Sequence, residues 1–555
     1  MDSSLTQEEI NHFIRRLSAL EGERKKGWES HWRDLSRNFL PRRARFLDAG
    51  ELTNDGKVMN MLQSGVGILA LRTLANGMQS GLTSPARPWF SLDLTDKQIA
   101  DTEDAKLWLH DTYEKMVEVF RQTNFYDQIH ILYSELACFG TGAMIIEADK
   151  KNIIRCRTLT VGEYALDAGE DGRVDTIYRR VRMTPRQIKQ AWPDTCPDTI
   201  LDMVKNDVNA WITVLHVVEP NESHKNGSRL PKERPYRSVY LILEGARREV
   251  LEDSGYYEFP ALCPRWLTTA SDVYGGSPAM DALADCRQLQ KVAETSRIAL
   301  EKEVNPPLLV YNKGLLGDPD MSPGSVNYSS VLTPGQDVIV PFSQVKANLP
   351  AAENLINRLE NILQRHFHND LFLMISDAHK TMTATEVAER NAEKMLMLGP
   401  VLDRLRSELF QPLIERVYGI MDRRGIVAFP PEHLAGQGVN VEFISILAQA
   451  QKQAGIGGLS QTIGFAAQVY PMWPEIVDKL NFDEMMDSWA EMQGIAPNLI
   501  RSDEDVAQLR QQRAQQQQAA QIMAMMQQGA DAAAKGSQAM KNMQPPATEE
   551  TAAIQ

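Results

Sequence analysis

The spacing of apolar and polar positions divides the chain into a helical N-terminal part, a β-rich middle and a helical remainder. Apolar side chains recur at helical spacing through residues 6–39, where Thr6 and Glu9 form the pattern of a capping box. Residues 90–94 alternate like a strand after the breakers at 84–88. Four helices are expected before residue 142, over residues 6–39, 58–82, 101–122 and 125–139.

From 143 to about 268 the pattern changes to the two-residue period of strands. Turn-forming residues at 149–152 and 169–172 predict two hairpins, and Thr184 with Pro185 predicts the start of a short helix that reaches Trp192. The region lacks the regular strand–helix alternation of a doubly wound fold, so an α+β, helix-rich class is expected. The expected strands cover residues 143–148, 153–159, 163–166, 174–182, 211–218 and 239–243.

The next region predicts a protruding pair of helices. Tyr274-Gly275-Gly276-Ser277-Pro278 is a tight turn that leads into an N-cap serine and an N1 proline. The helix that follows continues over 277–303, a length of roughly 40 Å at 1.5 Å per residue. A short module rich in Gly and Pro then precedes a second helix from about Pro350 to Leu373. Two long helices around a compact module predict a hairpin with a knob at its tip.

The C-terminal third is predicted to be mainly helical. Thr383 to Glu386 is a capping box that opens a long helix, and its apolar spacing continues through Pro412, which predicts a kink there rather than an end. Residues 441–493 are expected to be helical again. Residues 503–528, rich in Gln, Ala and Met, fit either a terminal helix of a ring-shaped assembly or a disordered tail, and 529–555 have the composition of disorder.

Composition indicates an ordinary soluble globular protein. The 555 residues are 43% hydrophobic and 24% charged, and this length predicts roughly two to four domains or one large composite domain. The net charge of −14 argues against a surface that grips DNA phosphates throughout. Residues 12–46 nevertheless contain ten Arg and Lys against four Asp and Glu. A solvated helix face is the favoured interpretation, and contact with an acidic neighbouring subunit or with DNA is the alternative.

Cysteine spacing and hydropathy exclude several classes. The five cysteines include no CxxC pair, so neither a zinc site nor a disulfide framework is indicated. The first residues lack the pattern of a signal peptide, and the apolar stretch 61–82 is interrupted by polar side chains. We therefore expect a protein made in the cytoplasm, with no membrane partner.

No enzyme motif is present in the sequence. It lacks GxxxxGK[ST], HExxH and GxSxG, and Gly65-Val66-Gly67 indicates close packing rather than a dinucleotide site. His366 and His368 would point about 200° apart on a helix, which disfavours a metal site. Carboxylate pairs such as Asp483 and Glu484 do not single out a nuclease centre. We expect no catalytic residue, cofactor or metal, with a metal-dependent nucleic-acid enzyme as an alternative of another class.

The order of these elements resembles the portal, or head-to-tail connector, family of short-tailed DNA phages. The resemblance covers roughly residues 10–500 and is strongest over 274–303 and 382–418. It rests on an ordered set of segments rather than on one motif: the turn Tyr274 to Pro278, a helix with Leu283, Asp285, Leu289 and Gln290, the Pro/Gly module, a second helix, Met382-Thr383-Ala384-Thr385-Glu386-Val387 and Leu409-Phe410-Gln411-Pro412-Leu413.

The resemblance implies a division into wing, stem, clip and crown. The implied ranges are 1–55 for an N-terminal helical arm, 56–276 for an α+β wing, 277–303 for the first stem helix, 304–345 for the clip, 346–373 for the second stem helix, 374–383 for a channel loop, 384–424 for a long kinked wing helix, 425–500 for a helical crown and 501–555 for a Gln/Ala-rich helix and disordered tail.

The same resemblance implies a structural function in the virion. Twelve copies would form a ring, a dodecamer, at one capsid vertex, through which double-stranded DNA enters during packaging and leaves during ejection. Implied partners are the major capsid and scaffolding proteins, the terminase and tail adaptor proteins. A mostly acidic lining would leave the duplex mobile, with His379, Lys380 and Thr381 as candidate phosphate contacts or simply an exposed loop. Another phage ring or tail adaptor protein is the alternative.

Overall fold

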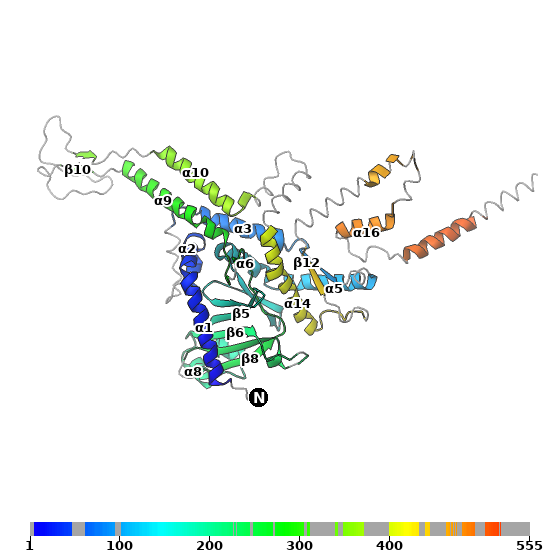
Figure 1. Ribbon diagram of the computed structural model, residues 1–555, viewed down its shortest axis with the longest axis horizontal. Coiled ribbons are helices and arrows are strands. Elements are labelled where there is room, and N and C mark those ends of the chain that lie inside the picture. The colour runs from blue at the N-terminus through cyan, green and yellow to red at the C-terminus, as the bar shows by residue number, and fades with distance from the viewer. Residues whose placement is uncertain are drawn as a thin grey trace, which may run out of the picture.

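The structure, a computed structural model, shows a body of helices and antiparallel sheets from which two helices project (Figure 1). These are α9 (Pro278–Val304) and α10 (Leu349–His366), which lie side by side. We call this pair the spike. The structure describes residues 5–46, 62–94, 102–225, 227–228, 230–244, 248–269, 272–304, 308–310, 339–341, 348–370, 399–431, 439–443 and parts of 462–522.

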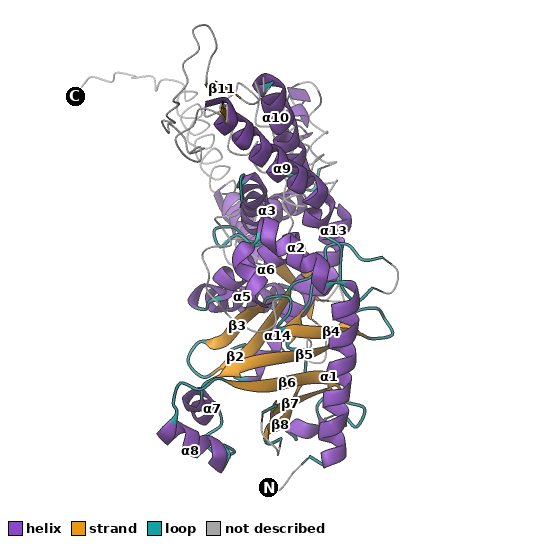
Figure 2. Ribbon diagram, turned by 90° about the vertical axis from the view of Figure 1, so that its left-hand side faces the viewer, coloured by secondary structure: helices purple, strands orange, loops and turns teal. Residues whose placement is uncertain are grey.

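The largest sheet is the middle of three layers. Its five antiparallel strands follow the order β4-β5-β6-β7-β8. Leu215 and Val217 of β6 pack beneath α1, whereas Val214 packs beneath α7 and α8, because successive side chains of a strand point to opposite faces. The helices therefore cover opposite faces of the sheet (Figure 2). The bounds are β4 Tyr164–Ala168, β5 Val174–Met183, β6 Ile212–Pro220, β7 Tyr236–Ile242, β8 Val250–Tyr256, α1 Gln7–Gly27, α7 Pro185–Ala191 and α8 Asp198–Asn206.

A second sheet and several helices enclose the main hydrophobic core, in which Trp89 stacks on Phe125 at 6.0 Å between ring centroids. This sheet has the order β3-β2-β9, and β1 pairs with β12 at the rim of the body. The bounds are α2 Glu29–Phe39, α3 Val66–Leu82, β1 Phe90–Leu94, α5 Glu103–Gln122, α6 Phe125–Phe139, β2 Ala143–Asp149, β3 Ile153–Leu159, β9 Ala261–Leu262, α14 Gln411–Arg423 and β12 Val439–Phe443.

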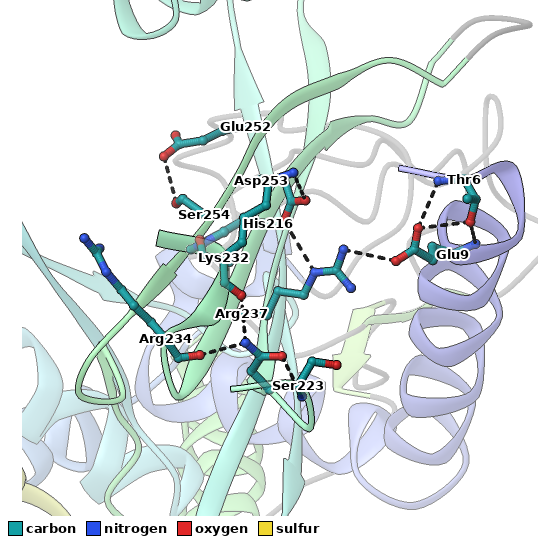
Figure 3. A network of polar contacts seen from close by, with 12 residues as sticks. Thr6, Glu9, His216, Ser223, Lys232, Arg234, Arg237, Glu252, Asp253 and Ser254 are labelled. Carbon is teal, nitrogen blue, oxygen red and sulfur yellow. Dashed lines mark hydrogen bonds and ion pairs between the residues drawn. The ribbon is translucent and has the colours of Figure 1, made fainter. Parts of the chain in front are cut away.

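Ion pairs fasten α1 to the five-stranded sheet. Arg237 of β7 lies between Glu9 of α1, at 3.2 Å, and Asp253 of β8, at 3.4 Å (Figure 3). Farther along α1, Arg16 pairs with Asp167 at 2.9 Å. The helix is thus an integral layer of the body, and part of the basic excess of residues 12–46 is used inside the subunit.

Most elements expected from local pattern are present. α6 has the predicted bounds, Thr6 and Glu9 form the capping box, and Thr184 caps α7. Both predicted hairpins pair, as β2 with β3 and as β4 with β5. α8, β8 and β9 were not predicted, since α8 is short and β9 has only two residues.

Several helix boundaries differ from the prediction. The second helix of the spike, expected to reach Leu373, ends at His366, and two further differences lie near the N-terminus. The first helix is divided at Trp28 into α1 and α2. The helix expected from about residue 58 begins only at Val66. Before it, the backbone N–H groups of Gln63 and Ser64 both donate to the Gln290 side-chain oxygen, at 2.7 and 3.0 Å. The chain is held against α9 there by side-chain hydrogen bonds that compete with helix formation.

The prediction of helix from residue 441 is wrong at its start. Residues 439–443 form β12, antiparallel to β1, with Val441 opposite Leu92. The segment Val-Asn-Val-Glu-Phe has the two-residue alternation of a strand, a signal that the neighbouring helical pattern obscured. Farther on, residues 505–520 are helical, and Arg510 pairs with Asp483 at 2.6 Å. Residues 503–528 were expected to form either a terminal helix or a disordered tail, and over 505–520 the helix is the one observed.

The prediction that Pro412 does not end the helix is confirmed. α13 (Gly399–Leu405), a π-helical segment η4 (Arg406–Phe410) and α14 follow one another without a break. The N–H of Gln411 donates to the Arg406 carbonyl oxygen, five residues earlier. This wider turn accommodates Pro412, which has no N–H of its own. The earlier part of that predicted helix, 384–398, lies outside the described residues.

Candidate functional site

The spike predicted from the sequence is present, and it projects from the body instead of being buried within it (Figure 1). The first turns of α9 are buried, through Ala279, Ala282 and Cys286. At the far end Leu300 and Val304 are 47% and 68% exposed. The stem-like hairpin is therefore anchored at one end only within the described part of the chain.

The base of α9 uses every residue of the turn Tyr274 to Pro278. The Tyr274 ring packs edge-on against Trp32 at 5.0 Å, and its hydroxyl accepts a hydrogen bond from the Leu166 N–H at 3.1 Å. The Gly276 N–H donates to the Leu267 carbonyl oxygen at 2.6 Å. Pro278 is the first residue of the helix, as predicted. We call this turn, together with Gly140, the spike base.

Gly140 brings the end of α6 against the spike base. Its φ of +74° is left-handed, and its carbonyl oxygen accepts from the Trp266 N–H at 2.8 Å. A Cβ atom at Gly140 would lie 2.1 Å from the Gly275 carbonyl oxygen. The Ser277 hydroxyl adds a 2.8 Å hydrogen bond to the Cys138 carbonyl oxygen. Two chain segments thus meet backbone to backbone, which leaves no room for a side chain between them.

A buried ion pair fixes the segment that precedes the spike base. The Arg265 guanidinium contacts both carboxylate oxygens of Glu408, at 2.6 and 3.2 Å, and the Arg265 backbone N–H donates to the same carboxylate at 2.9 Å. The two side chains are 5% and 8% exposed. Arg265 also donates to the Gly172 carbonyl oxygen at 2.7 Å. The sequence search missed this pair, because its partners are 143 residues apart.

The two helices of the spike are held together near the body. Phe367, which follows α10, contacts Phe39 of α2 at 5.4 Å between centroids. His366 lies 3.1 Å from the Asp285 carboxylate of α9. His368 has left the helix and has a φ of +51°. Gly67 of α3 is buried beside Phe39 and Cys286 of α9, which confirms the packing role expected of that glycine.

The exposed face of α10 carries amides and arginines. At 100° per residue the amide and arginine side chains named at the end of this paragraph share one side of the helix, and Glu353 and Glu360 lie at the margin of that side. Neither Arg358 nor Arg365 forms an ion pair with a described residue. On α9, in contrast, Arg287 pairs with Asp34 at 2.7 Å. The members of the exposed face are Asn354, Asn357, Arg358, Asn361, Gln364 and Arg365. Their helical spacing is visible in the sequence, but the sequence alone does not show which side of the helix is exposed.

Other candidate residues are placed less completely. His379, Lys380 and Thr381 lie outside the described residues, as does most of 304–345, of which only the antiparallel pair β10 (Leu308–Val310) and β11 (Ile339–Pro341) is described. Within the described ranges no three His, Cys, Asp or Glu residues are placed to hold a metal ion. No helix in the part of the chain that is described has the length and apolar character to cross a bilayer.

The end of the N-terminal helical region is fixed on a buried carboxylate of α6. Glu135 is fully buried, and one of its oxygens accepts from Thr160 at 3.1 Å and lies 3.2 Å from Arg43 Nε. Burial raises the pKa of Glu135 to about 7, although the Arg43 guanidinium opposes this shift.

We expect Glu135→Gln to flatten the pH dependence of stability. Because the pKa of Glu135 is raised from 4.5 to about 7 on folding, the folded state holds the proton more tightly, and stability falls as pH rises through this window. The free energy of unfolding falls by at most about 1.4 kcal/mol per pH unit. Urea unfolding of the wild type and of Glu135→Gln at pH 5 and pH 8 measures this loss. Equal losses in the wild type and the variant would show that Glu135 does not titrate there.

Comparisons with known proteins identify the family. Residues 11–500 match the model of the bacteriophage head to tail connecting protein family. The chain is 37% identical to the "Probable portal protein" of Bordetella phage BPP-1 over 532 residues, 95% of each chain. It is also 37% identical to the "Portal protein" of Salmonella phage epsilon15 over 544 residues, 97% of each chain.

Solved structures show weaker similarity. A chain from the neck of a native gene transfer agent particle is 13% identical, with a TM-score of 0.35 over 74% of this chain and 90% of that one. A chain from the neck of the empty particle is 12% identical, with a TM-score of 0.36 over 71% and 86%. The full-length sequence relatives carry the assignment: the chain belongs to the family of bacteriophage head to tail connecting proteins, and its role is the structural one of a portal protein at the head–tail junction of the virion.

Proposed function

We propose that twelve copies of the chain form a ring at one capsid vertex and that their spikes together enclose a passage for double-stranded DNA. The observation that carries this proposal is the spike itself, a pair of helices anchored only at its base among the described residues (Figure 1). Related by rotation about one axis, such spikes form the wall of a tube. The body then corresponds to the wing, and α9 and α10 correspond to the stem.

The exposed face of α10 is the side that we assign to the DNA. Amide and guanidinium groups donate hydrogen bonds to phosphate oxygens without reading bases, as a sliding duplex requires. Two arginines per subunit, Arg358 and Arg365, leave the lining far less basic than that of a protein that grips DNA, whose affinity rises with every phosphate neutralised. His379, Lys380 and Thr381 stay candidates for further contacts of the same kind.

The far end of the spike is proposed to contact other proteins. The pair β10 and β11 lies beyond the ends of α9 and α10 that are distant from the body (Figure 1). We infer that the module 304–345 meets the terminase during packaging and tail adaptor proteins afterwards. The body would face the capsid and scaffolding proteins. The family assignment argues against both the tail adaptor and the enzyme alternatives.

Reversing two charges tests the assignment of α10 to the passage. We expect Arg358→Glu/Arg365→Glu to form rings normally but to package at least tenfold less DNA, because each subunit would present two negative charges to the phosphates in place of two positive ones. Packaging is measured as nuclease-protected DNA in assembled heads. Lys150→Glu/Lys151→Glu, in the exposed β2–β3 turn, changes the net charge equally and is expected to package normally.

The two parts of the proposal fail separately. Normal packaging by the α10 variant would remove that face from the passage and leave the ring intact. A wild-type chain that stays monomeric at high concentration in negative-stain images would overturn the ring itself.

A further inference from the structure

The N-terminal helical region ends in η1 (Pro41–Phe46), a short 3-10 helix after α2. Its Arg43 lies with Nε 3.2 Å from one carboxylate oxygen of Glu135 on α6, and another guanidinium nitrogen donates to the Thr160 hydroxyl at 2.8 Å. Thr160, in the segment between β3 and β4, donates to the same Glu135 oxygen at 3.1 Å. Three segments of the chain thus meet in a closed triangle of polar side chains. We call this triangle the arm contact.

The two charges of the arm contact have different access to water. The Glu135 side chain is 1% exposed, whereas the Arg43 side chain is 30% exposed. An arginine stays charged throughout the pH range in which proteins are folded, so Glu135 is the partner that changes its charge. A proton on Glu135 removes the attraction between opposite charges, which is strong where water is excluded. The charge of Glu135 therefore decides how firmly Arg43 is held.

Titratable groups of η1, α6, β4 and the segment between β3 and β4 face Glu135. Burial raises the pKa of Glu135 from 4.5 to about 7, and the Arg43 guanidinium lowers it. The Glu163 carboxylate, in the segment between β3 and β4, adds to the rise. Cys138 of α6 and Tyr164 of β4 stay neutral, because burial raises the pKa of each well above its ordinary value. Glu135 therefore gains its proton close to neutral pH.

We propose that the arm contact is a pH-sensitive fastening, which holds η1 firmly on the body above neutral pH and loosens it in acid. Above neutral pH the charged Glu135 attracts Arg43. In acid Glu135 is neutral, and the hydrogen bonds of Arg43 then reach only uncharged oxygen atoms within the arm contact. The free energy of unfolding of the whole chain moves the other way, because a buried charge is costly. The part of that free energy that Arg43 contributes nevertheless grows as pH rises.

Acid is expected to loosen η1 and not the helices before it. α1 is held on the five-stranded sheet by the ion pair of Arg16 with Asp167, and its Arg24 donates to the Tyr164 carbonyl oxygen. Neither of these contacts uses Glu135. Glu135 itself lies on α6, the helix that ends at the spike base. The arm contact therefore joins the end of the N-terminal region to the helix that supports the spike.

Hydrogen–deuterium exchange of the full chain tests the fastening. The Arg43 N–H donates to the Leu40 carbonyl oxygen at 2.9 Å, so its protection reports whether η1 is formed. After correction for the intrinsic effect of pH on exchange, we expect peptides from 41–46 to exchange at least about fivefold faster at pH 5.5 than at pH 8.5, within the tenfold that one pKa unit represents. Peptides from α6 are the internal reference and should not change. Equally slow exchange of 41–46 at both pH values would overturn the fastening.

Variants separate charge pairing from a merely structural contact. Glu135→Gln and Arg43→Ala should each show fast exchange of 41–46 at both pH values, whereas Arg42→Ala, at the exposed neighbouring position, should keep the wild-type dependence. Urea unfolding gives a second readout. Arg43→Ala is expected to raise the unfolding equilibrium constant at least about fivefold more at pH 8.5 than at pH 5.5, and this difference should vanish when Glu135→Gln is also present. An effect of Arg43→Ala that does not depend on pH would contradict the proposal.

Discussion

Replacing Gly140 with alanine is expected to lower the free energy of unfolding by at least about 3 kcal/mol. The new Cβ atom would lie 2.1 Å from the Gly275 carbonyl oxygen and 2.5 Å from that of Gly276. Both obstacles are main-chain atoms at the spike base, so no side-chain rotation relieves the clash. The left-handed φ of +74° adds a further cost of roughly 1 kcal/mol for a residue with a side chain. Urea unfolding followed by circular dichroism measures the loss.

Gly172→Ala is the matched control for this clash. Gly172 has the same φ of +74°, but a Cβ atom there would meet nothing within 4 Å. Its substitution carries the backbone cost alone and is expected to lower stability by about 1 kcal/mol. The difference between the two variants therefore isolates the close approach of α6 to the spike base. Equal losses would mean that the base can open without cost, and the rigid attachment of α9 would have to be abandoned.

The sequence revealed both segments of this junction but not the contact between them. Local spacing showed that Ser277 and Pro278 start a helix, and that Gly140 ends one, because caps and breakers act within a few residues. That Gly140 and Gly275 touch depends on how distant segments pack, which no local pattern encodes. The strand β12 was missed for a related reason: its partner β1 lies far away in the sequence, and five alternating residues beside a helical pattern are a weak signal.

The candidate site was also only partly predictable: the spike was predicted from the sequence, but the side of α10 that is exposed was not. The helical spacing of 277–303 and 350–373 was enough to predict the spike, although α10 ends at His366, and the order of segments was enough to suggest the family. Which face of α10 is exposed follows only once Leu359 and Leu363 are seen buried toward the body. The excess of cations in residues 12–46 was visible in the sequence. Which of these cations contact the body and which face solvent became clear only from the structure. Arg16 and Arg24 contact the body, whereas Lys26 is left facing solvent.

Arg265→Ala is expected to cost about 3 to 5 kcal/mol of unfolding free energy. The substitution removes the guanidinium that contacts both oxygens of Glu408. Among the described residues, that buried carboxylate then keeps only the backbone N–H of residue 265, at 2.9 Å, and Arg404, at 3.5 Å. It also removes the hydrogen bonds to the Gly172 and Asp272 carbonyl oxygens. Chemical unfolding measures the change, and the segment between β9 and α9 should become accessible to proteases.

A double-mutant cycle separates the ion pair from the other bonds of Arg265. Glu408→Ala alone leaves the Arg265 guanidinium buried without its carboxylate partner, whereas the double variant leaves neither charge buried. We therefore expect the double variant to be destabilised by at least about 2 kcal/mol less than the sum of the single changes. Arg297→Ala, at an exposed pair with Glu301 on α9, is the control and should cost less than about 1 kcal/mol. Additive losses at Arg265 and Glu408 would show that the two charges do not depend on each other, and that backbone contacts alone fix the segment below the spike.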